Sequence, residues 1–302
     1  MCQHFNQHLE WCMLTGMTHM TTPEYFARMS SSLGDKSEIV QYLSPGRVLD
    51  VGAGGGDLSA LMSSAGFRAT ALDGSLDAVN RIKAKAPEVE VVYSSTTNIQ
   101  EVLAGRSFEN IVCSSVLHEV FSYASGNVAE KMRALEDALM SFYELLEPGG
   151  RLVIRDGVAP QGSNGLTLMH LSSEAVDFLL NHYVRLCPFV DFLGGFQYNG
   201  NSTVLCTYRA AMEFAYTFTW GVKSAQRECQ ELYGVTTRDK YVSLLESHGF
   251  RVVNHYEYLQ MEYYENLRDH IDFMTPNKGG GSGFPSSNMV IVAEKPEHPV
   301  CL

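Results

Sequence analysis

Hydrophobic and polar positions follow two periods along this chain, one typical of short buried strands and one typical of amphipathic helices. Short, mostly apolar runs end in polar or glycine residues, which is the pattern of buried strands. From Val128 to Leu146 the apolar residues instead recur at steps of three or four, which predicts a helix with one buried stripe. The predicted strands cover residues 48–51, 69–73, 89–93, 151–156, 250–259 and 289–294, with a further strand from Phe108.

Helices alternate with these strands. They are predicted at 58–65, 75–85, 128–146 and 236–248, each closed by a glycine or a proline shortly after its last periodic residue. Strand–helix alternation favours a parallel sheet with helices on both faces, because parallel neighbours need a crossover connection. The sequence therefore predicts a doubly wound α/β fold over most of the chain.

A glycine-rich turn follows the first predicted strand. Asp50, Gly52, Gly54 and Gly56 give the spacing D-x-G-x-G-x-G, directly before a predicted helix. Glycines allow a tight turn and a close approach of ligand to backbone, and a helix N-terminus favours an anionic group. A dinucleotide fingerprint would place Asp57 at its last position, where a carboxylate would face the pyrophosphate, so that alternative is disfavoured.

A second acid ends the next predicted strand. Asp73 closes the run 69–73, and an ionised carboxylate there suits a ribose diol, since each oxygen accepts a hydrogen bond. Together, the glycine turn and this acid resemble motif I and the following strand of class I S-adenosylmethionine (SAM)-dependent methyltransferases. The turn from Glu147 to Gly150 is similar to the join before the fifth strand in that family.

The resemblance implies a Rossmann-like core with a seven-stranded, mostly parallel sheet, and SAM as cofactor with S-adenosylhomocysteine (SAH) as product. Near the adenine the family commonly has an acid after the third strand, where this chain has Ser95 and Thr96. A hydroxyl or the Thr96 backbone N–H is then expected to serve. Ser114, at the end of the fourth strand, is expected near the methionine part of SAM. The expected cofactor residues are Asp50, Gly52, Gly54, Gly56, Asp73, Gly74, Ser95, Thr96, Ser114 and Tyr25.

Two segments fall outside this core. Residues 1–45 are predicted to form helices over the cofactor, where Tyr25 either contacts the sulfonium by cation–π attraction or packs as an ordinary aromatic. Residues 158–235 hold 12 of the 32 aromatic residues and are too apolar for a linker. We expect them to form a helical cap over the acceptor site, between a core at 46–157 and its remainder at 236–302.

The candidate catalytic group is His118, which follows the fourth strand and titrates near neutrality. It acts as a general base in one interpretation and makes only local hydrogen bonds in the other. Glu119 beside it either orients the imidazole or points to solvent. Arg155 and Asp156, at the end of the fifth strand, bind a polar acceptor or pair with each other. His182 and Tyr183 in the cap are either acceptor-wall residues or core residues.

Composition limits the partners. The net charge is −12 and no dense Lys/Arg cluster is present, so we expect no nucleic-acid partner. The seven cysteines form no C-x-x-C pair, no histidine–carboxylate spacing indicates a metal site, and no apolar run could span a bilayer. The start of the chain has neither the basic residues nor the apolar core of a signal peptide. We therefore expect a cytoplasmic enzyme that can form a homodimer and has no membrane partner.

The predicted function is methyl transfer from SAM to an O or N atom of a small, aromatic or heteroaromatic acceptor. The alternatives are a methyltransferase of nucleic acid or protein, and a SAM-binding protein without catalysis.

Overall fold

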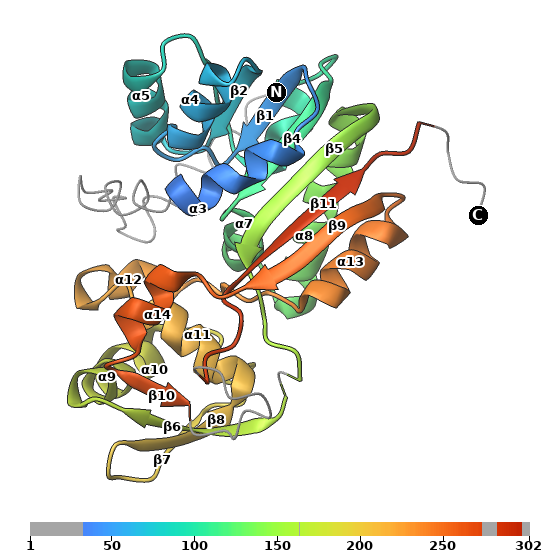
Figure 1. Cartoon of the computed structure of the whole chain (residues 1–302). Helices are drawn as coiled ribbons and strands as arrows, with labels where there is room; N and C mark the ends of the chain where they lie inside the picture. Colours follow the sequence, from blue (N-terminus) through green and yellow to red (C-terminus); the bar gives the residue numbers. More distant parts are fainter. Residues whose placement is uncertain (1–32, 163, 274–282, 298–302) are drawn as a thin grey trace.

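Seven strands form one large sheet in the order β3-β2-β1-β4-β5-β11-β9 in the computed structural model, which describes residues 33–162, 164–273 and 283–297 (Figure 1). Strands β1 to β5 are parallel, and β11 runs antiparallel to both β5 and β9. This confirms the predicted seven-stranded, mostly parallel sheet. The strands are β1 (Arg47–Val51), β2 (Arg68–Asp73), β3 (Glu90–Tyr93), β4 (Phe108–Ser114), β5 (Leu146–Gly157), β9 (Arg251–Tyr258) and β11 (Asn288–Glu294).

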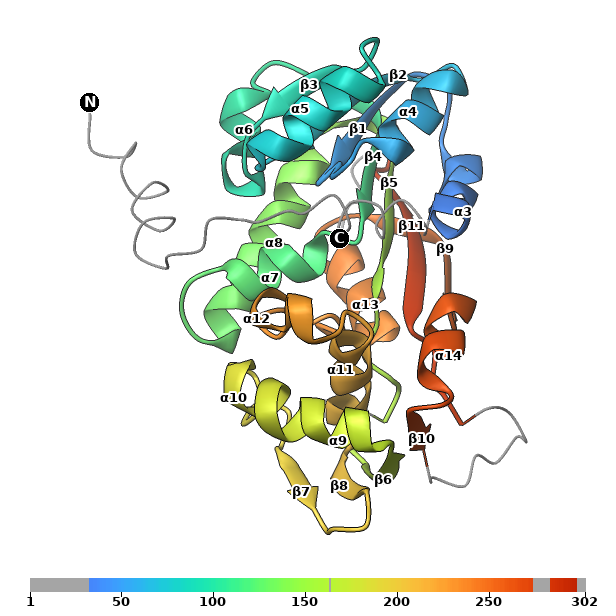
Figure 2. The ribbon, with the colours of Figure 1, turned by 90° about the vertical axis from the view of Figure 1, so that its left-hand side faces the viewer.

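Helices cover both faces of this sheet. Successive strand residues point to opposite sides, and both sides carry apolar side chains that must be buried. Val48 and Val112 pack with Met62 and Ile82 on one face, whereas Leu49 and its neighbours pack on the other. The first face carries α3 (Leu33–Ser37), η1 (Glu38–Tyr42), α4 (Asp57–Ser64) and α5 (Leu76–Lys85). The second carries α6 (Ile99–Val102), α7 (Leu117–Tyr123), α8 (Val128–Leu145) and α13 (Arg238–Ser247), as Figure 2 shows.

The predicted long helix is confirmed as α8. Its N-cap, Asn127, accepts hydrogen bonds from the N–H groups of Ala129 and Glu130, and the Glu130 carboxylate accepts from the Asn127 N–H. This reciprocal capping fixes where the helix begins. Strand β5 starts at Leu146, earlier than predicted, because Leu146 already pairs with Phe108 of β4.

The insertion after β5 contains a sheet that the sequence analysis did not predict. Four antiparallel strands, in the order β10-β6-β8-β7, lie below the main sheet in Figure 1. Strand β6 alternates exposed and buried positions, but Leu166 and Leu168 are apolar on its exposed side and hide the period in the sequence. The strands are β6 (Leu166–Leu171), β7 (Phe196–Tyr198), β8 (Thr203–Thr207) and β10 (Ile271–Phe273).

Helices complete the insertion. The predicted helix at 173–186 forms as two α-helical segments joined by a π-helical turn, and the aromatic segment Tyr208–Phe218 forms α11. Two elements from the last part of the chain, α14 and β10, join this unit because β10 pairs with β6. The helices are α9 (Ser173–Phe178), η3 (Leu179–Tyr183), α10 (Val184–Leu186), α11 (Tyr208–Phe218), η4 (Val222–Ser224), α12 (Ala225–Glu228) and α14 (Met261–Leu267).

Of the helices expected at 1–45, the structure describes α3 and η1, and Tyr25 lies outside the described residues. None of the helices in the described parts of the chain is long and apolar enough to cross a membrane.

Candidate active site

The glycine turn after β1 has the backbone that its composition predicts. Gly52, Gly54 and Gly56 all have positive φ, at +67°, +55° and +79°. A Cβ atom on Gly52 would collide with Cγ2 of Val116, and one on Gly56 would lie 2.8 Å from Cγ1 of Ile82. Only glycine fits these positions without strain, and the turn leads directly into the N-terminus of α4.

Asp73 joins this turn to the end of β2. Its carboxylate accepts hydrogen bonds from the backbone N–H of Gly54 and of Ser75, each at 2.8 Å. Burial raises its pKa above the ordinary value, although both hydrogen bonds act against that rise. Gly74 is exposed beside it, and an added Cβ would lie 3.7 Å from the Ser94 carbonyl, so the ends of β2 and β3 are neighbours.

Ser95 and Thr96 lie next to this point, half-buried at the start of η2 (Thr96–Asn98). Asp50 lies deeper than the turn. It is buried, its carboxylate accepts from the Ser59 hydroxyl at 2.5 Å, and burial raises its pKa to about 6. The Asp50 carboxylate therefore ties β1 to α4 beneath the glycine turn.

Ser114 ends β4 on the far side of the turn. Its side chain is buried, and its hydroxyl has no hydrogen-bond partner among the described residues. A buried polar atom is normally paired, so an unpaired one indicates a missing group. A glycine cradle, an acid at the next strand end and this orphaned hydroxyl lie around one point of the carboxyl edge, where doubly wound sheets bind ligands. These residues fit SAM.

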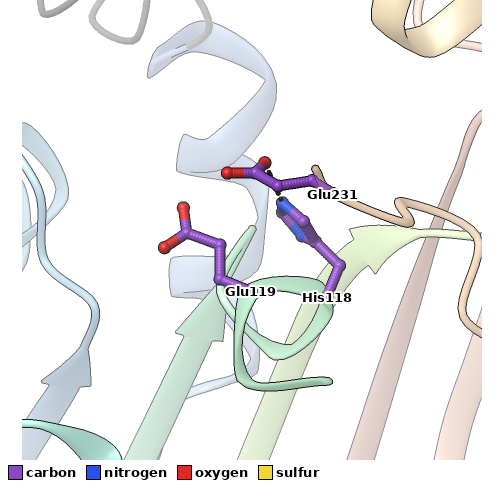
Figure 3. A group of neighbouring side chains, drawn as sticks. All are labelled: His118, Glu119 and Glu231. Carbon is purple, nitrogen blue, oxygen red and sulfur yellow. Dashed lines mark ion pairs between the residues drawn. The ribbon is translucent and has the colours of Figure 1, made fainter. Parts of the chain in front are cut away.

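His118 lies in the first turn of α7, directly after that edge, and both of its ring nitrogens face carboxylates. Nδ1 lies 2.6 Å from Oδ1 of Asp156. Nε2 lies 3.4 Å from Oε2 of Glu231, the ion pair that the dashed line in Figure 3 marks. The ring stacks on Tyr233 with centroids 4.9 Å apart. Burial lowers the pKa of His118, but Asp156 and Glu231 together raise it well above the ordinary value. The imidazole is therefore held in its protonated form near neutral pH.

Asp156 is the best-anchored of these partners. Besides the His118 ring, it accepts hydrogen bonds from the backbone N–H of Leu117, His118 and Gly157. Burial acts to raise its pKa, but His118 and these bonds leave it below the ordinary value. Asp156 thus orients the histidine, a role that was one of the two alternatives for Glu119.

Arg155 points elsewhere and does not pair with Asp156, because neighbouring strand residues face opposite sides. Its guanidinium binds Asp35 of α3, and Nη1 donates to the Ser115 hydroxyl at 2.8 Å. Tyr258 and Gln260 complete its contacts. Arg155 therefore holds α3 against the ends of β4 and β5.

Two acids of the insertion were missed in the sequence, Glu228 and Glu231. Glu231 accepts a hydrogen bond from the Tyr123 hydroxyl at 2.6 Å, and Glu228 accepts one from the Tyr233 hydroxyl. Burial and Glu231 raise the pKa of Glu228 to about 8 and that of half-buried Glu119 to about 7. The only local signal was the acid pair Glu-Cys-Gln-Glu at 228–231.

His118, Glu119 and Glu231 also form a group with metal-ligand chemistry, which the sequence analysis did not expect. One ligand atom from each lies within 4.8 Å of the others. In Figure 3 both carboxylates lie on one side of the imidazole, that of Glu231, from the loop after α12, next to the ring and that of Glu119, from α7, farther from it.

A cavity opens beside this cluster, between the carboxyl edge of the main sheet and the insertion. His182 and Tyr183 are not among its lining residues. Tyr183 is a core residue packed edge-on against Phe196 and Phe214, and His182 lies against Phe178. The lining is formed by Lys36, Ser115, His118, Glu119, Arg155, Asp156, Gly157, Tyr216, Thr219, Trp220, Glu228, Glu231, Tyr233, Gln260, Glu262, Tyr263, Asn266 and Asn288.

Comparison with known proteins identifies the family. Residues 28–255 match the sequence profile of a family described as "Methyltransferase domain". A SAM-dependent methyltransferase from Archaeoglobus fulgidus superposes with a TM-score of 0.51 at 14% identity, covering 89% of this chain and 94% of that one. At that identity the likeness shows the fold.

Further solved structures superpose with lower scores. For a SAM-dependent methyltransferase from Methanosarcina mazei the TM-score is 0.48 at 14% identity, covering 86% of this chain and 98% of that one. For the N-methyltransferase NodS from Bradyrhizobium japonicum, in complex with SAH, it is 0.45 at 12% identity, with coverage of 92% and 90%. No curated protein sequence matches the chain. With its profile match and its seven-stranded fold, the chain belongs to the methyltransferase-domain family and is a class I SAM-dependent methyltransferase.

Proposed function

We propose that this methyltransferase acts on a small molecule with an aromatic or heteroaromatic part and methylates an O or N atom. The cavity beside His118 carries this proposal, because four aromatic rings line it next to the expected cofactor edge. They come from α11, the loop after it, the loop after α12, and α14. The rings are those of Tyr216, Trp220, Tyr233 and Tyr263.

The cofactor residues follow from the geometry of the edge. Gly52, Gly54 and Gly56 supply a backbone surface that a ligand can approach, and Asp73 with Gly74 suits the ribose. Ser95 and Thr96 lie where the adenine is expected, and the Ser114 hydroxyl is suited to the methionine part. SAM supplies an activated methyl group, so the protein must align the acceptor, exclude water and remove a proton where the acceptor carries one.

Two groups are candidates for removing that proton. His118 can act only after losing the proton that Asp156 and Glu231 hold on it, and its raised pKa disfavours this role near neutral pH. Glu119 has a pKa of about 7 and lines the cavity, so its carboxylate can accept a proton near neutral pH. We propose that Glu119 is the base. His118 instead acts as a positioning residue, because its ion pair with Glu231 holds that carboxylate beside the acceptor.

The charge of the cavity disfavours a nucleic-acid substrate. Five acidic side chains line it against three cations, Lys36, Arg155 and the protonated His118, and a phosphate backbone would be repelled. Arg155, one of the three cations, already binds Asp35, and His118 already binds Asp156.

The test is to incubate the protein with methyl-labelled SAM and either a metabolite extract, total RNA or total protein. We expect label in a compound of low molecular mass that is aromatic by its absorbance. Label recovered only in RNA or protein would instead assign a macromolecular substrate. Cofactor binding without label in any fraction would favour a SAM-binding protein without catalysis.

A further inference from the structure

The cavity beside His118 is lined by more acidic than basic side chains. Its acids are Glu119, Asp156, Glu228, Glu231 and Glu262, and its cations are Lys36, Arg155 and the protonated His118. The guanidinium of Arg227 lies near three of the acids, 3.8 Å from Glu119, 3.9 Å from Glu228 and 3.7 Å from Glu231. One guanidinium and the His118 ring are therefore shared among four closely placed carboxylates.

Glu228 gives a second, independent indication. Its side chain is only 1% exposed, its Oε2 accepts from the Tyr233 hydroxyl, and its Oε1 has no hydrogen-bond partner among the described residues. Arg227 Nε, 3.9 Å from this Oε1 atom, is too far away to donate a hydrogen bond. The ionised form of Glu228 is therefore costly, in agreement with a pKa raised to about 8. Because Glu228 lines the cavity, a cationic donor that enters the cavity can satisfy Oε1 and stabilise the ionised form.

Aromatic rings form the adjoining wall. Tyr216 stands edge-on to Tyr263 and tilted against Tyr233, with both pairs of centroids 5.5 Å apart. The Tyr216 hydroxyl lies within hydrogen-bond distance of the carbonyl oxygens of Val158 and Ser287, either of which can accept its proton, so the ring is fixed in place. Fixed aromatic faces beside carboxylates bind organic cations by cation–π attraction and ion pairing.

We infer that the methyl acceptor is an alkylamine that carries an aromatic ring and enters the cavity as an organic ammonium ion, its N–H groups facing the Glu228 and Glu119 carboxylates. This inference rests on the proposed small-molecule function and narrows its acceptor to nitrogen. A bare anion is excluded by the carboxylates, and a neutral alcohol leaves their charge uncompensated.

The chemistry balances with groups at hand. The ammonium gives one proton to the Glu119 carboxylate, which frees the nitrogen lone pair. That lone pair forms the N–C bond to the methyl group of SAM. At the same time the S–C bond breaks, and the two electrons of the S–C bond stay on sulfur. Glu119 faces His118, Glu231, Arg227 and Asp73, and it has a pKa of about 7, raised by burial and by Glu231. It therefore exchanges a proton near neutral pH.

Two other occupants would use the same carboxylates, a divalent metal ion at His118, Glu119 and Glu231, and the sulfonium of SAM itself. The aromatic wall favours an organic cation over a metal ion, since oxygen and nitrogen ligands alone would suffice for a metal. Both rivals are outcomes of the experiment below.

The experiment uses three probes that share one phenethyl group: phenethylamine and 2-phenylethanol, which are nearly equal in shape, and the larger trimethylammonium analogue of phenethylamine. Calorimetry in the presence of SAH measures their binding to the full chain, and labelled SAM measures methyl transfer to phenethylamine and 2-phenylethanol. We expect phenethylamine to bind at least ten-fold more tightly than the alcohol and more tightly than the trimethylammonium analogue, which keeps the charge but has no N–H group. Label should enter phenethylamine only. Binding of the alcohol or of the trimethylammonium ion that equals or exceeds that of phenethylamine would overturn the inference.

Glu228→Gln supplies the matched variant, because glutamine keeps the shape and can still accept from Tyr233. Losing a charge-assisted hydrogen bond should weaken amine binding by roughly ten-fold or more. Glu265→Gln is the control, since Glu265 is exposed and outside the cavity lining. Equal effects of both variants would contradict the inference.

Further arms separate the rivals. If Glu228→Gln weakens SAM but not SAH binding, the carboxylates serve the sulfonium. If EDTA abolishes methyl transfer and Mg²⁺ or Mn²⁺ restores it, they serve a metal ion. Either result overturns the amine assignment. Label in the neutral alcohol alone would leave the small-molecule function intact, whereas label confined to RNA or protein would remove that function as well.

Discussion

The Nδ1 atom of His118 lies 2.6 Å from Oδ1 of Asp156, and the same ring turns Nε2 toward Glu231. The pair joins the first turn of α7 to the end of β5, and Glu231 adds the insertion to the same ring. A single imidazolium thus links the cofactor edge to the wall of the cavity. Its protonation state should therefore be visible both in stability and in catalysis.

The first prediction concerns stability against pH. Because the folded-state pKa of His118 is raised, its stabilising charge is fully present below about 6.5 and is lost as pH rises through the folded-state value. His118→Gln should lower the free energy of unfolding by about 3 kcal/mol at pH 6, by leaving buried carboxylates unpaired. The loss should shrink at alkaline pH. Urea denaturation across this range measures it, with exposed His255→Gln as control. A pH-independent difference would contradict the ion-pair account.

The second prediction concerns the base. The ionised, active form of Glu119 grows as pH rises through about 7, so kcat/KM should rise over the same range. Glu119→Gln should lower turnover by roughly 10²–10⁴-fold and remove this acidic limb, with SAM affinity nearly constant. His118→Gln should reduce the rate but keep the limb. If the limb instead lies well above pH 7 and disappears in His118→Gln, the histidine is the base.

The third prediction concerns the glycine turn. Gly52→Ala places a methyl group against Val116 at a φ of +67°, so SAM binding should weaken at least ten-fold. Gly66→Ala is the control. Its φ is +95°, which is equally unfavourable for alanine, but open space surrounds it beyond the end of α4. Calorimetry with SAH should separate the two variants; similar affinities would mean that the turn does not approach the ligand.

The fourth prediction concerns Ser114. Removing a buried hydroxyl that lacks a partner should leave the stability of the free protein unchanged or slightly raised. If the hydroxyl binds the cofactor, Ser114→Ala should weaken SAM affinity by about 3- to 10-fold, the value of one neutral hydrogen bond. Thermal unfolding with and without SAM measures both effects. A loss of stability in the free protein would show that the hydroxyl has a structural partner.

Much of the core could be predicted from the sequence because its signals are local. The glycine turn, Asp73 and the stripe of α8 each lie within one element, so spacing alone locates them. The strands of the insertion were harder to predict from the sequence. Exposed Leu166 and Leu168 mask the alternation of β6, and β10 reaches that sheet from a distant part of the chain.

The site shows the same limit. His118 stands out because it follows a strand end, but its partner Glu231 lies far along the chain and is brought near only by folding. Arg155 and Asp156 were found as a pair by position, yet strand alternation sends one to Asp35 and the other to His118. Tyr183 is of a residue type that could line an acceptor cavity, but it is buried in the aromatic core of the insertion. Contacts of this kind depend on packing that no local pattern encodes.

The most direct test of the account is a crystal structure of the protein with SAH bound. We predict that the adenosine lies along Asp73 and Ser95, that the backbone of Gly52 and Gly54 contacts the ligand, and that the sulfur faces the cavity at Ser115 and Glu119. A sulfur atom directed away from that cavity, or SAH bound elsewhere than at the glycine turn, would contradict the assignment of this cavity as the place of methyl transfer.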